Sequence, residues 1–366
     1  MRHGGYCTTS YPVMSGGSGV VVFPINRYIV GNMYAPPLMR SFPRWLLFLL
    51  IGFVLPSCSI NQFVLRRAGD VLAGAGSGAN VFTSDDDPEL IKAALPLVLK
   101  LYDALLEEDE TNPDLWLAAA SGYVSYANAF LDTPAQMLPS RAFEEREQKL
   151  VRAKRLYLRG RDRALHGLAL HDSRFLAAPS SEAFAQAVEN TSARHVPLLY
   201  WAAAGWLGAV SVDPFDLSTT VSQEYAASLM HRAYALEPDF EDGAIHEFYI
   251  SYYAALPDNP EEGRRRARYH FEQAVELSKG GKSSPYVSLG EAVSRREQNL
   301  AEFVELMELA LSVDLDQLPQ HRLVNTIRQE QAAWYLDNLG RFFLDAESWD
   351  EDWDDDWDDD WDEDDW

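Results

Sequence analysis

The stretch AASLMHRAYALEP, residues 226–238, decides the fold. Ala226, Met230 and Ala233 place a small residue, a large apolar residue four positions later and a second small residue three beyond it. On the second helix of a tetratricopeptide-type pair, the small residues let two helices approach closely, and the large residue fills the groove between units. The stretch therefore predicts one half of a helix pair in a repeated array.

Related spacings occur elsewhere in the chain. They are Ala153, Tyr157 and Gly160, then Ala267, Phe271 and Ala274, and a first-helix pattern at Tyr286, Leu289, Gly290 and Val293. Prolines mostly fall between the apolar helical segments or at their starts, and alternating β-branched runs are almost absent. We predict an all-α fold over residues 85–346: a bundle or solenoid of antiparallel helix pairs with cryptic tetratricopeptide-like repeats.

The segment LFLLIGFVLPSCS, residues 47–59, predicts export. Its apolar run covers residues 45–55, which is too short for a spanning helix of roughly 20 residues, and Arg40 and Arg44 precede it. A basic start, a short apolar middle and a small residue before the cut are typical of a secretory signal. The alternative interpretation is a buried core element.

Cys58 directly after the cut resembles the acylated cysteine of a bacterial lipoprotein, although Pro56 departs from the usual small or β-branched residue. We therefore expect lipidation at Cys58, with acyl chains such as palmitate. Starting from Met39, residues 39–57 form the signal peptide, residues 1–38 are an over-extended N-terminus, and residues 58–84 are the lipid-anchored segment and linker.

The formal net charge of −25 is concentrated at the C-terminus, where residues 349–366 hold thirteen acids, five Trp and no base. The charge argues against nucleic acid as a partner. Repelling Asp runs oppose a helix, so we predict a disordered acidic Trp/Asp tail over residues 347–366. The tail is interpreted either as an arm steered toward a basic partner or as an extension without a dedicated partner.

The helical body resembles one family through several strings. They are VFTSDDDPELIKAALPLVLKLYDALLEED (81–109), LWLAAASGYVSYANAF (115–130), AKRLYLRGRDRALHGL (153–168), VPLLYWAAAGWLGAV (196–210), GAIHEFYISYYAALP (243–257), ARYHFEQAVELSKG (267–280) and LVNTIRQEQAAWYL (323–336). Together they resemble the T component of tripartite ATP-independent periplasmic (TRAP) transporters. The resemblance implies a helical lipoprotein, a homotrimer with an opening through each subunit, and docking of a periplasmic solute-binding subunit.

Aromatic residues at helical spacing are candidates for a ligand groove, although such residues more commonly form a core. The candidates are Tyr123, Tyr126, Phe130, Trp201, Trp206, His246, Tyr249 and Tyr252. Small neighbours, as in LAAASGY and WAAAGW, leave room beside the rings. In the family interpretation these helices line an opening for an apolar or amphipathic solute.

A basic cluster at Arg264, Arg265, Arg266 and Arg268 predicts either a solvated face balanced by nearby acids or a docking patch for an acidic partner. Residues 152–163 form a second basic helix with the same two interpretations, and this helix could also meet the acidic tail. The histidines show no metal-ligand spacing, and no phosphate-loop or hydrolase motif occurs. We therefore predict no catalytic residues, metal or cofactor.

The leading hypothesis is a non-enzymatic subunit of solute uptake, anchored by lipid in the bacterial envelope and facing the periplasm, with the inner leaflet of the outer membrane preferred. It docks a periplasmic solute-binding protein. The alternative is a general periplasmic scaffold for envelope or outer-membrane assembly, because concave helical repeats bind many partners. An enzyme using a carboxylate pair is a third, weaker hypothesis.

Overall fold

A computed structural model of the chain describes residues 78–256 and 258–346. Every described residue belongs to one compact unit. The predicted N-terminal extension, the signal peptide, Cys58 and the acidic tail lie outside the described residues, so they stay predictions.

The described residues form helices and no strand, which confirms the predicted all-α fold. The α-helices are α3 (Gly78–Thr83), α4 (Pro88–Glu108), α5 (Pro113–Ala127), α6 (Thr133–Met137), α7 (Phe143–Ala169), α8 (Glu182–Glu189), α9 (Val196–Val212), α10 (Leu217–Thr220), α11 (Gln223–Leu236), α12 (Phe240–Ala254), α13 (Pro260–Leu277), α14 (Ser284–Leu289), α15 (Leu300–Leu311) and α16 (Arg322–Leu336). Two π-helical segments interrupt this pattern, η1 (Asn128–Asp132) after α5 and η5 (Gly290–Ser294) after α14. The remaining η segments are short 3₁₀ turns at η2 (Ser140–Ala142), η3 (Ser173–Leu176), η4 (Ala193–His195), η6 (Pro319–His321) and η7 (Leu339–Arg341).

Helix starts follow the sequence signals. The Asp87 side chain accepts a hydrogen bond from the backbone N–H of Leu90, and Pro88 is the first residue of α4. Asn112 caps α5 in the same way, and Asn259 caps α13. These side chains satisfy amide groups that the first helical turn leaves without partners, and proline loses nothing at a position whose N–H has no helical acceptor.

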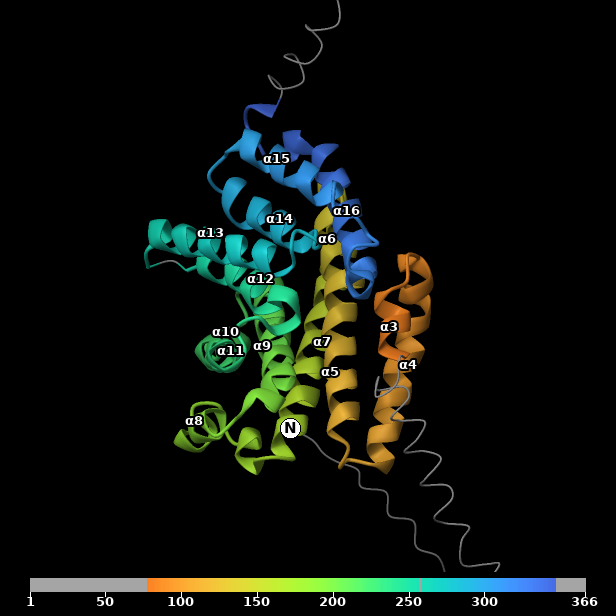
Figure 1. Ribbon diagram of the computed structural model, residues 1–366, viewed down its shortest axis with the longest axis vertical. Coiled ribbons are helices and arrows are strands. Elements are labelled where there is room, and N and C mark those ends of the chain that lie inside the picture. The colour runs from red at the N-terminus through yellow and green to blue at the C-terminus, as the bar shows by residue number, and fades with distance from the viewer. Residues whose placement is uncertain (1–77, 257, 347–366) are drawn as a thin grey trace, which may run out of the picture. The chain divides into compact units, whose positions relative to one another are not determined.

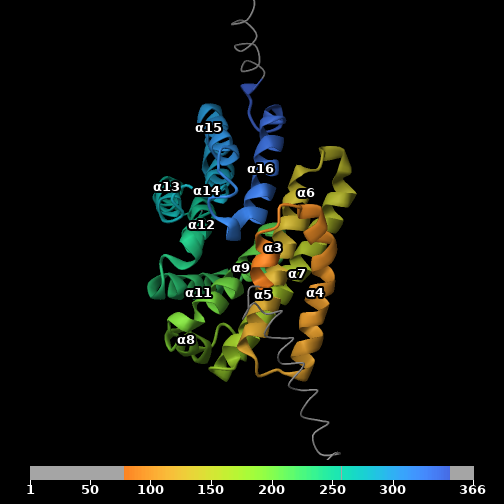
Figure 2. The ribbon, with the colours of Figure 1, turned by 45° about the vertical axis from the view of Figure 1, so that its right-hand side comes forward.

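The helices pack mainly on their neighbours in the chain. α4 packs on α5, α5 on α7, α7 on α9 and α9 on α11, while α12 pairs with α13 and α15 pairs with α14 and α16 (Figures 1 and 2). Helices α5, α7 and α9 lie side by side in both views. This arrangement of successive helix pairs matches the predicted bundle or solenoid.

Glycines mark close approaches between helices, and one of them, Gly160, belongs to the repeat pattern. A side chain on Gly160 would place its Cβ 2.6 Å from Cγ2 of Val124 and 2.9 Å from the carbonyl oxygen of Ala120, both on α5. A Cβ on Gly205 of α9 would lie 2.8 Å from the carbonyl oxygen of Tyr157 on α7. The two glycines therefore set how closely α7 packs against the helices on either side.

The buried apolar side chains of the described residues form three clusters. One lies around α4, α5 and α7, the second around α9, α11 and the start of α12, and the third around α14, α15 and α16. Leu115, Leu199 and Phe303 are among the most buried residues of the respective clusters. The three cores follow one another along the chain, as expected when each helix pair packs mainly on the next pair.

Candidate functional site

The predicted aromatic groove residues lie mostly inside the protein. Tyr123, Tyr126, Phe130, Trp206, His246 and Tyr249 are buried, whereas Trp201 and Tyr252 are half-buried. The structure brings Tyr123, Tyr126 and Phe130 into one core, and Trp206, Tyr249 and Tyr252 into another. His246 contacts this second core through the ring of Tyr234, with centroids 5.4 Å apart. Trp201 on α9 packs against both cores, so it links the two groups.

The second group centres on a pair of buried imidazoles, which we name the His246–His270 pair. The Nδ1 atoms of His246 on α12 and His270 on α13 are 3.0 Å apart, so one ring must donate to the other. The rings of Tyr249 and Tyr253 lie 4.8 and 5.3 Å from that of His270. Burial lowers the pKa of both histidines, that of His270 to about 4, and Arg266 adds to the shift at His270. Both rings are therefore neutral at pH 7.

The sequence analysis did not identify His270 as a candidate site residue. Its partner His246 lies 24 positions earlier, on a different helix, so no local spacing connects the two. The hydroxyl of Tyr249 is buried and has no hydrogen-bond partner among the described residues. Burial raises the pKa of this phenol, with neighbouring tyrosines contributing. The cluster thus combines apolar ring faces with one buried hydroxyl, that of Tyr249, which lacks a hydrogen-bond partner among the described residues. Small-molecule sites usually combine a mostly apolar lining with a few polar groups.

A second interior feature is a chain of polar contacts around Arg328 of α16. Its Nη2 donates to Oδ1 of Asn128 at 3.2 Å, and its Nη1 donates to Oε1 of Gln331 at 2.6 Å. Gln331 in turn donates to Glu291 at 3.0 Å. Asn128 lies in η1 and Glu291 in η5, so α16 connects both π-helical segments.

The same chain continues to a buried carboxylate. Tyr157 donates to Oδ2 of Asp132 at 3.0 Å and accepts from Asn128 at 3.2 Å, and Gln136 donates to Oδ1 of Asp132 at 2.9 Å. Burial raises the pKa of Asp132 above its ordinary value, while these hydrogen bonds and Arg328 favour the ionised form. π-helical segments occur frequently at functional sites, and this polar residue set was not identified from the sequence.

A third interior feature is a left-handed turn at the start of α12. Glu241, Asp242 and Gly243 have φ of 45°, 54° and 91°, a conformation that side-chain-bearing residues rarely adopt. Lys282 stabilises it by donating to the carbonyl oxygen of Glu241 at 3.1 Å and by pairing with the Glu247 carboxylate. The Lys282 side chain is only 5% exposed, so the cation depends on these two partners.

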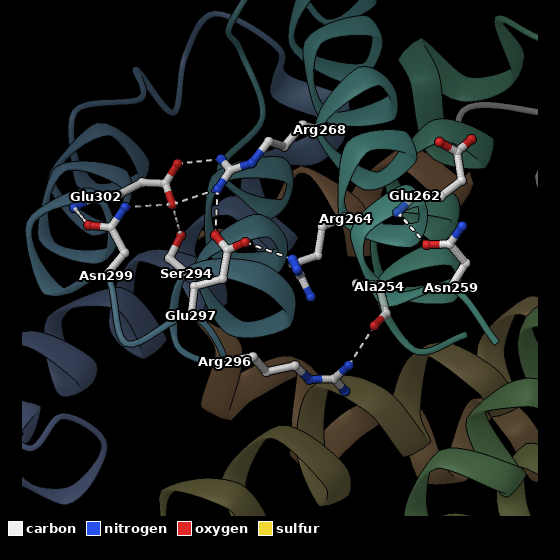
Figure 3. Close-up of polar contacts among 10 residues, drawn as sticks. All are labelled: Ala254, Asn259, Glu262, Arg264, Arg268, Ser294, Arg296, Glu297, Asn299 and Glu302. Atoms are coloured by element: carbon white, nitrogen blue, oxygen red, sulfur yellow. Dashed lines mark hydrogen bonds and ion pairs between the residues drawn. The ribbon is translucent and has the colours of Figure 1, made fainter. Parts of the chain in front are cut away.

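The predicted basic docking patch is largely ion-paired (Figure 3). Arg264 and Arg268 contact Glu297 at 2.7 and 2.8 Å, and Arg268 also pairs with Glu302. The other two arginines, Arg265 and Arg266, pair with Glu262 at 2.7 and 2.8 Å. The side chains of Arg265 and Arg266 remain 74% and 52% exposed, so they are the most exposed members of the patch.

A cleft of about 790 Å³ lies between α8 and α11, and its lining residue His231 stacks on Tyr249, one of the predicted aromatic residues, with ring centroids 5.7 Å apart. Its lining is Ala185, Gln186, Val188, Glu189, Asn190, Ser228, His231, Arg232 and Ala235. Arg232 donates to the carbonyl oxygens of Glu189 and Thr191 at 2.8 Å each, which holds the end of α8 in place. The Arg232 guanidinium therefore mainly stabilises the fold.

One described stretch, Ala193–Val212, is long and apolar enough to cross a membrane by length and composition. It contains α9, and 56% of its most apolar window is buried against the rest of the protein. A central core helix meets the same criteria, and α9 packs on α5, α7 and α11. Within residues 78–256 and 258–346, no group of three or more His, Cys, Asp or Glu side chains is arranged to hold a metal ion.

Successive packed helix pairs without a strand among the described residues place the protein in the class of all-α bundles or solenoids. A family model described as "TRAP transporter T-component" matches residues 84–343, and the chain belongs to this family. The family is a transporter subunit family rather than a known enzyme family, and a TRAP transporter component belongs to the bacterial cell envelope. A relative from Treponema pallidum (strain Nichols), described as "Uncharacterized protein", is 31% identical over 302 residues, covering 79% of this chain and 94% of the relative.

Proposed function

We propose that this chain is the lipid-anchored periplasmic T subunit of a TRAP-type uptake system, and that it docks the solute-binding protein of that system. Membership of the T-component family is the observation that carries the proposal. In this proposal acylated Cys58 holds the protein at the membrane, with the inner leaflet of the outer membrane as its site. A homotrimer of such chains keeps the solute-binding protein close to the membrane, which raises its local concentration.

Two exposed surfaces are proposed to meet the solute-binding protein. Phe215, Leu217 and Val221 are 91%, 73% and 70% exposed, and they form an apolar patch at α10, which we name the α10 patch. Exposed apolar patches on soluble domains commonly mark protein interfaces. The exposed pair Arg265 and Arg266 supplies charge, which acts mainly on the association rate, whereas desolvated apolar contacts act mainly on dissociation.

The proposal includes an apolar or amphipathic solute held in the aromatic interior. The half-buried rings of Trp201 and Tyr252 border the buried cores, and the neutral His246–His270 pair adds hydrogen-bonding groups without adding charge. Such a lining suits a mostly apolar molecule with one polar end. Organic extraction of the purified protein followed by mass spectrometry tests this part, and W201A/Y252A should retain less of the extracted molecule.

Docking is tested by capture from periplasmic extract with the full chain as bait, followed by mass spectrometry and by binding kinetics with the recovered partner. We expect an extracytoplasmic solute-binding protein. F215S/L217S should speed dissociation of the solute-binding protein. R265Q/R266Q should slow its association and reduce the salt dependence of the association rate. L344S, at a residue 89% exposed, is the control. Recovery of envelope-assembly proteins instead would support the general periplasmic scaffold and refute the transport proposal.

A further inference from the structure

The α7 helix carries three exposed arginines on one face, at Arg152, Arg155 and Arg159. Their spacing of three and four positions aligns them along the helix. None of them forms an ion pair with a described residue. Among the described residues, Arg155 donates only to the carbonyl oxygen of Val151 in its own helix, at 3.4 Å. We name this face the α7 cationic stripe.

Aromatic rings lie under two of these guanidinium groups. Arg152 lies over the Tyr126 ring at 5.8 Å from its centroid, and Arg159 over the Tyr123 ring at 5.3 Å. The rings orient the guanidinium groups but do not neutralise them. Arg163, one turn further on, differs because it pairs with Asp103 at 2.8 Å. The stripe is therefore left with unpaired positive charge, in contrast to the ion-paired patch at residues 264–268.

The stripe gathers three positive charges on one helix face of a chain whose formal net charge is −25. Opposite charges attract, so a strongly anionic segment is attracted to this stripe. Residues 349–366 carry thirteen acids, and their five Trp rings can stack on guanidinium groups. The composition of this segment is complementary to the stripe in both charge and aromatic character.

The last part of the described chain contacts the segment just before α7. Nη2 of Arg341 donates to the carbonyl oxygen of Leu138 at 2.9 Å, and α7 begins at Phe143. From Phe143 to Arg159 the helix rises about 24 Å, at about 1.5 Å per residue. Twenty residues of chain reach at most about 66–72 Å. The tail is therefore long enough to reach the whole stripe of its own chain.

We propose that the acidic Trp/Asp tail, residues 347–366, docks on the α7 cationic stripe of its own chain and covers it against other acidic surfaces. Covalent attachment favours this occupant, because a short tether gives an effective concentration near the millimolar range and weak ion pairs then suffice. The inference goes beyond the proposed transport role and does not depend on the solute-binding protein.

Zero-length carbodiimide crosslinking of the full chain tests the proposal, since it joins carboxylates to nearby lysine amines. Lys149 lies one turn before Arg152 with its side chain 30% exposed, and Lys92 and Lys100, 42% and 64% exposed, are internal comparisons on α4. We expect tail crosslinks to concentrate on Lys149 and to decline in 1 M salt, because salt screens exposed charges.

R152Q/R155Q/R159Q should lower the yield at Lys149 by about tenfold, which corresponds to about 1.4 kcal/mol. The matched variant R152K/R155K/R159K keeps the charge, so it should keep the crosslinks at Lys149 and gain new ones at the substituted positions. Circular dichroism checks that both variants are folded.

Equal yields at Lys149, Lys92 and Lys100, or no loss in R152Q/R155Q/R159Q, would overturn the proposal. A mixture of ¹⁵N-labelled and unlabelled chains separates the possible occupants. Crosslinks that stay within one isotope support docking on the same chain. Mixed-isotope crosslinks at the statistical frequency would assign the stripe to the tail of a second copy, and the proposal would fail.

Discussion

Replacement of Lys282 by methionine should destabilise the protein strongly. The Lys282 side chain is 5% exposed and that of Glu247 17%, so the two charges depend on each other rather than on water. Methionine keeps most of the volume but leaves the Glu247 carboxylate without its cation and the carbonyl oxygen of Glu241 without its donor. Breaking a buried pair by removing one partner costs about 3–5 kcal/mol of the free energy of unfolding.

The assay is urea unfolding of the full chain at pH 7, followed by circular dichroism and by tryptophan fluorescence. K282M should lower the free energy of unfolding by about 3–5 kcal/mol, whereas K282M/E247Q should lose less, because no unpaired charge stays buried. K92M, at an exposed lysine on α4, is the control and should stay within about 0.5 kcal/mol of the parent. If K282M also stayed in that range, the pair would not stabilise the left-handed turn, and the reasoning would be refuted.

Three further outcomes follow from the packing and the pKa shifts. G160A should lower the free energy of unfolding by about 1–3 kcal/mol in the same assay, because its Cβ enters the contact between α5 and α7, whereas G340A, with nothing within 4 Å, should not. Y157F removes a hydrogen bond from buried Asp132 and should cost about 1–3 kcal/mol, and a neutral result would contradict the assigned network. His270 has a pKa lowered to about 4 in the folded chain, so the unfolded chain takes up its proton first, near pH 6.5, as the pH falls. The free energy of unfolding should therefore decrease from pH 6.5 towards pH 4, and it should decrease less steeply in H270F; equal slopes would show that the buried imidazole does not titrate as assigned.

Local rules made the helical body readable from the sequence. The features that predict helices depend on neighbours within one or two turns. They are caps such as Asp87 and Asn112, proline at helix starts, and the small residues at 153, 160, 226, 233, 267 and 274. All six of these small residues are buried in the structure. The family resemblance relied on the same packing strings, and the family match over residues 84–343 agrees with it.

The candidate site was less predictable, because its groups come from distant parts of the chain. The sequence placed His246 on an aromatic helix, but only the pairing of α12 with α13 brings His270 within 3.0 Å of it. Arg328 and Asn128 are 200 positions apart, and Lys282 and Glu241 are 41 apart. No local spacing rule detects such contacts.

The charged residues show most clearly what the sequence determines and what the tertiary structure determines. The sequence by itself determined the helical periodicity, the two basic segments and the acidic tail, since these depend only on residue order. Only the tertiary structure decided that the arginines of residues 264–268 pair with Glu262, Glu297 and Glu302, whereas Arg152, Arg155 and Arg159 form no ion pair with a described residue. The physical reason is that the strength of an ion pair falls with distance and exposure to water, and helix packing sets both.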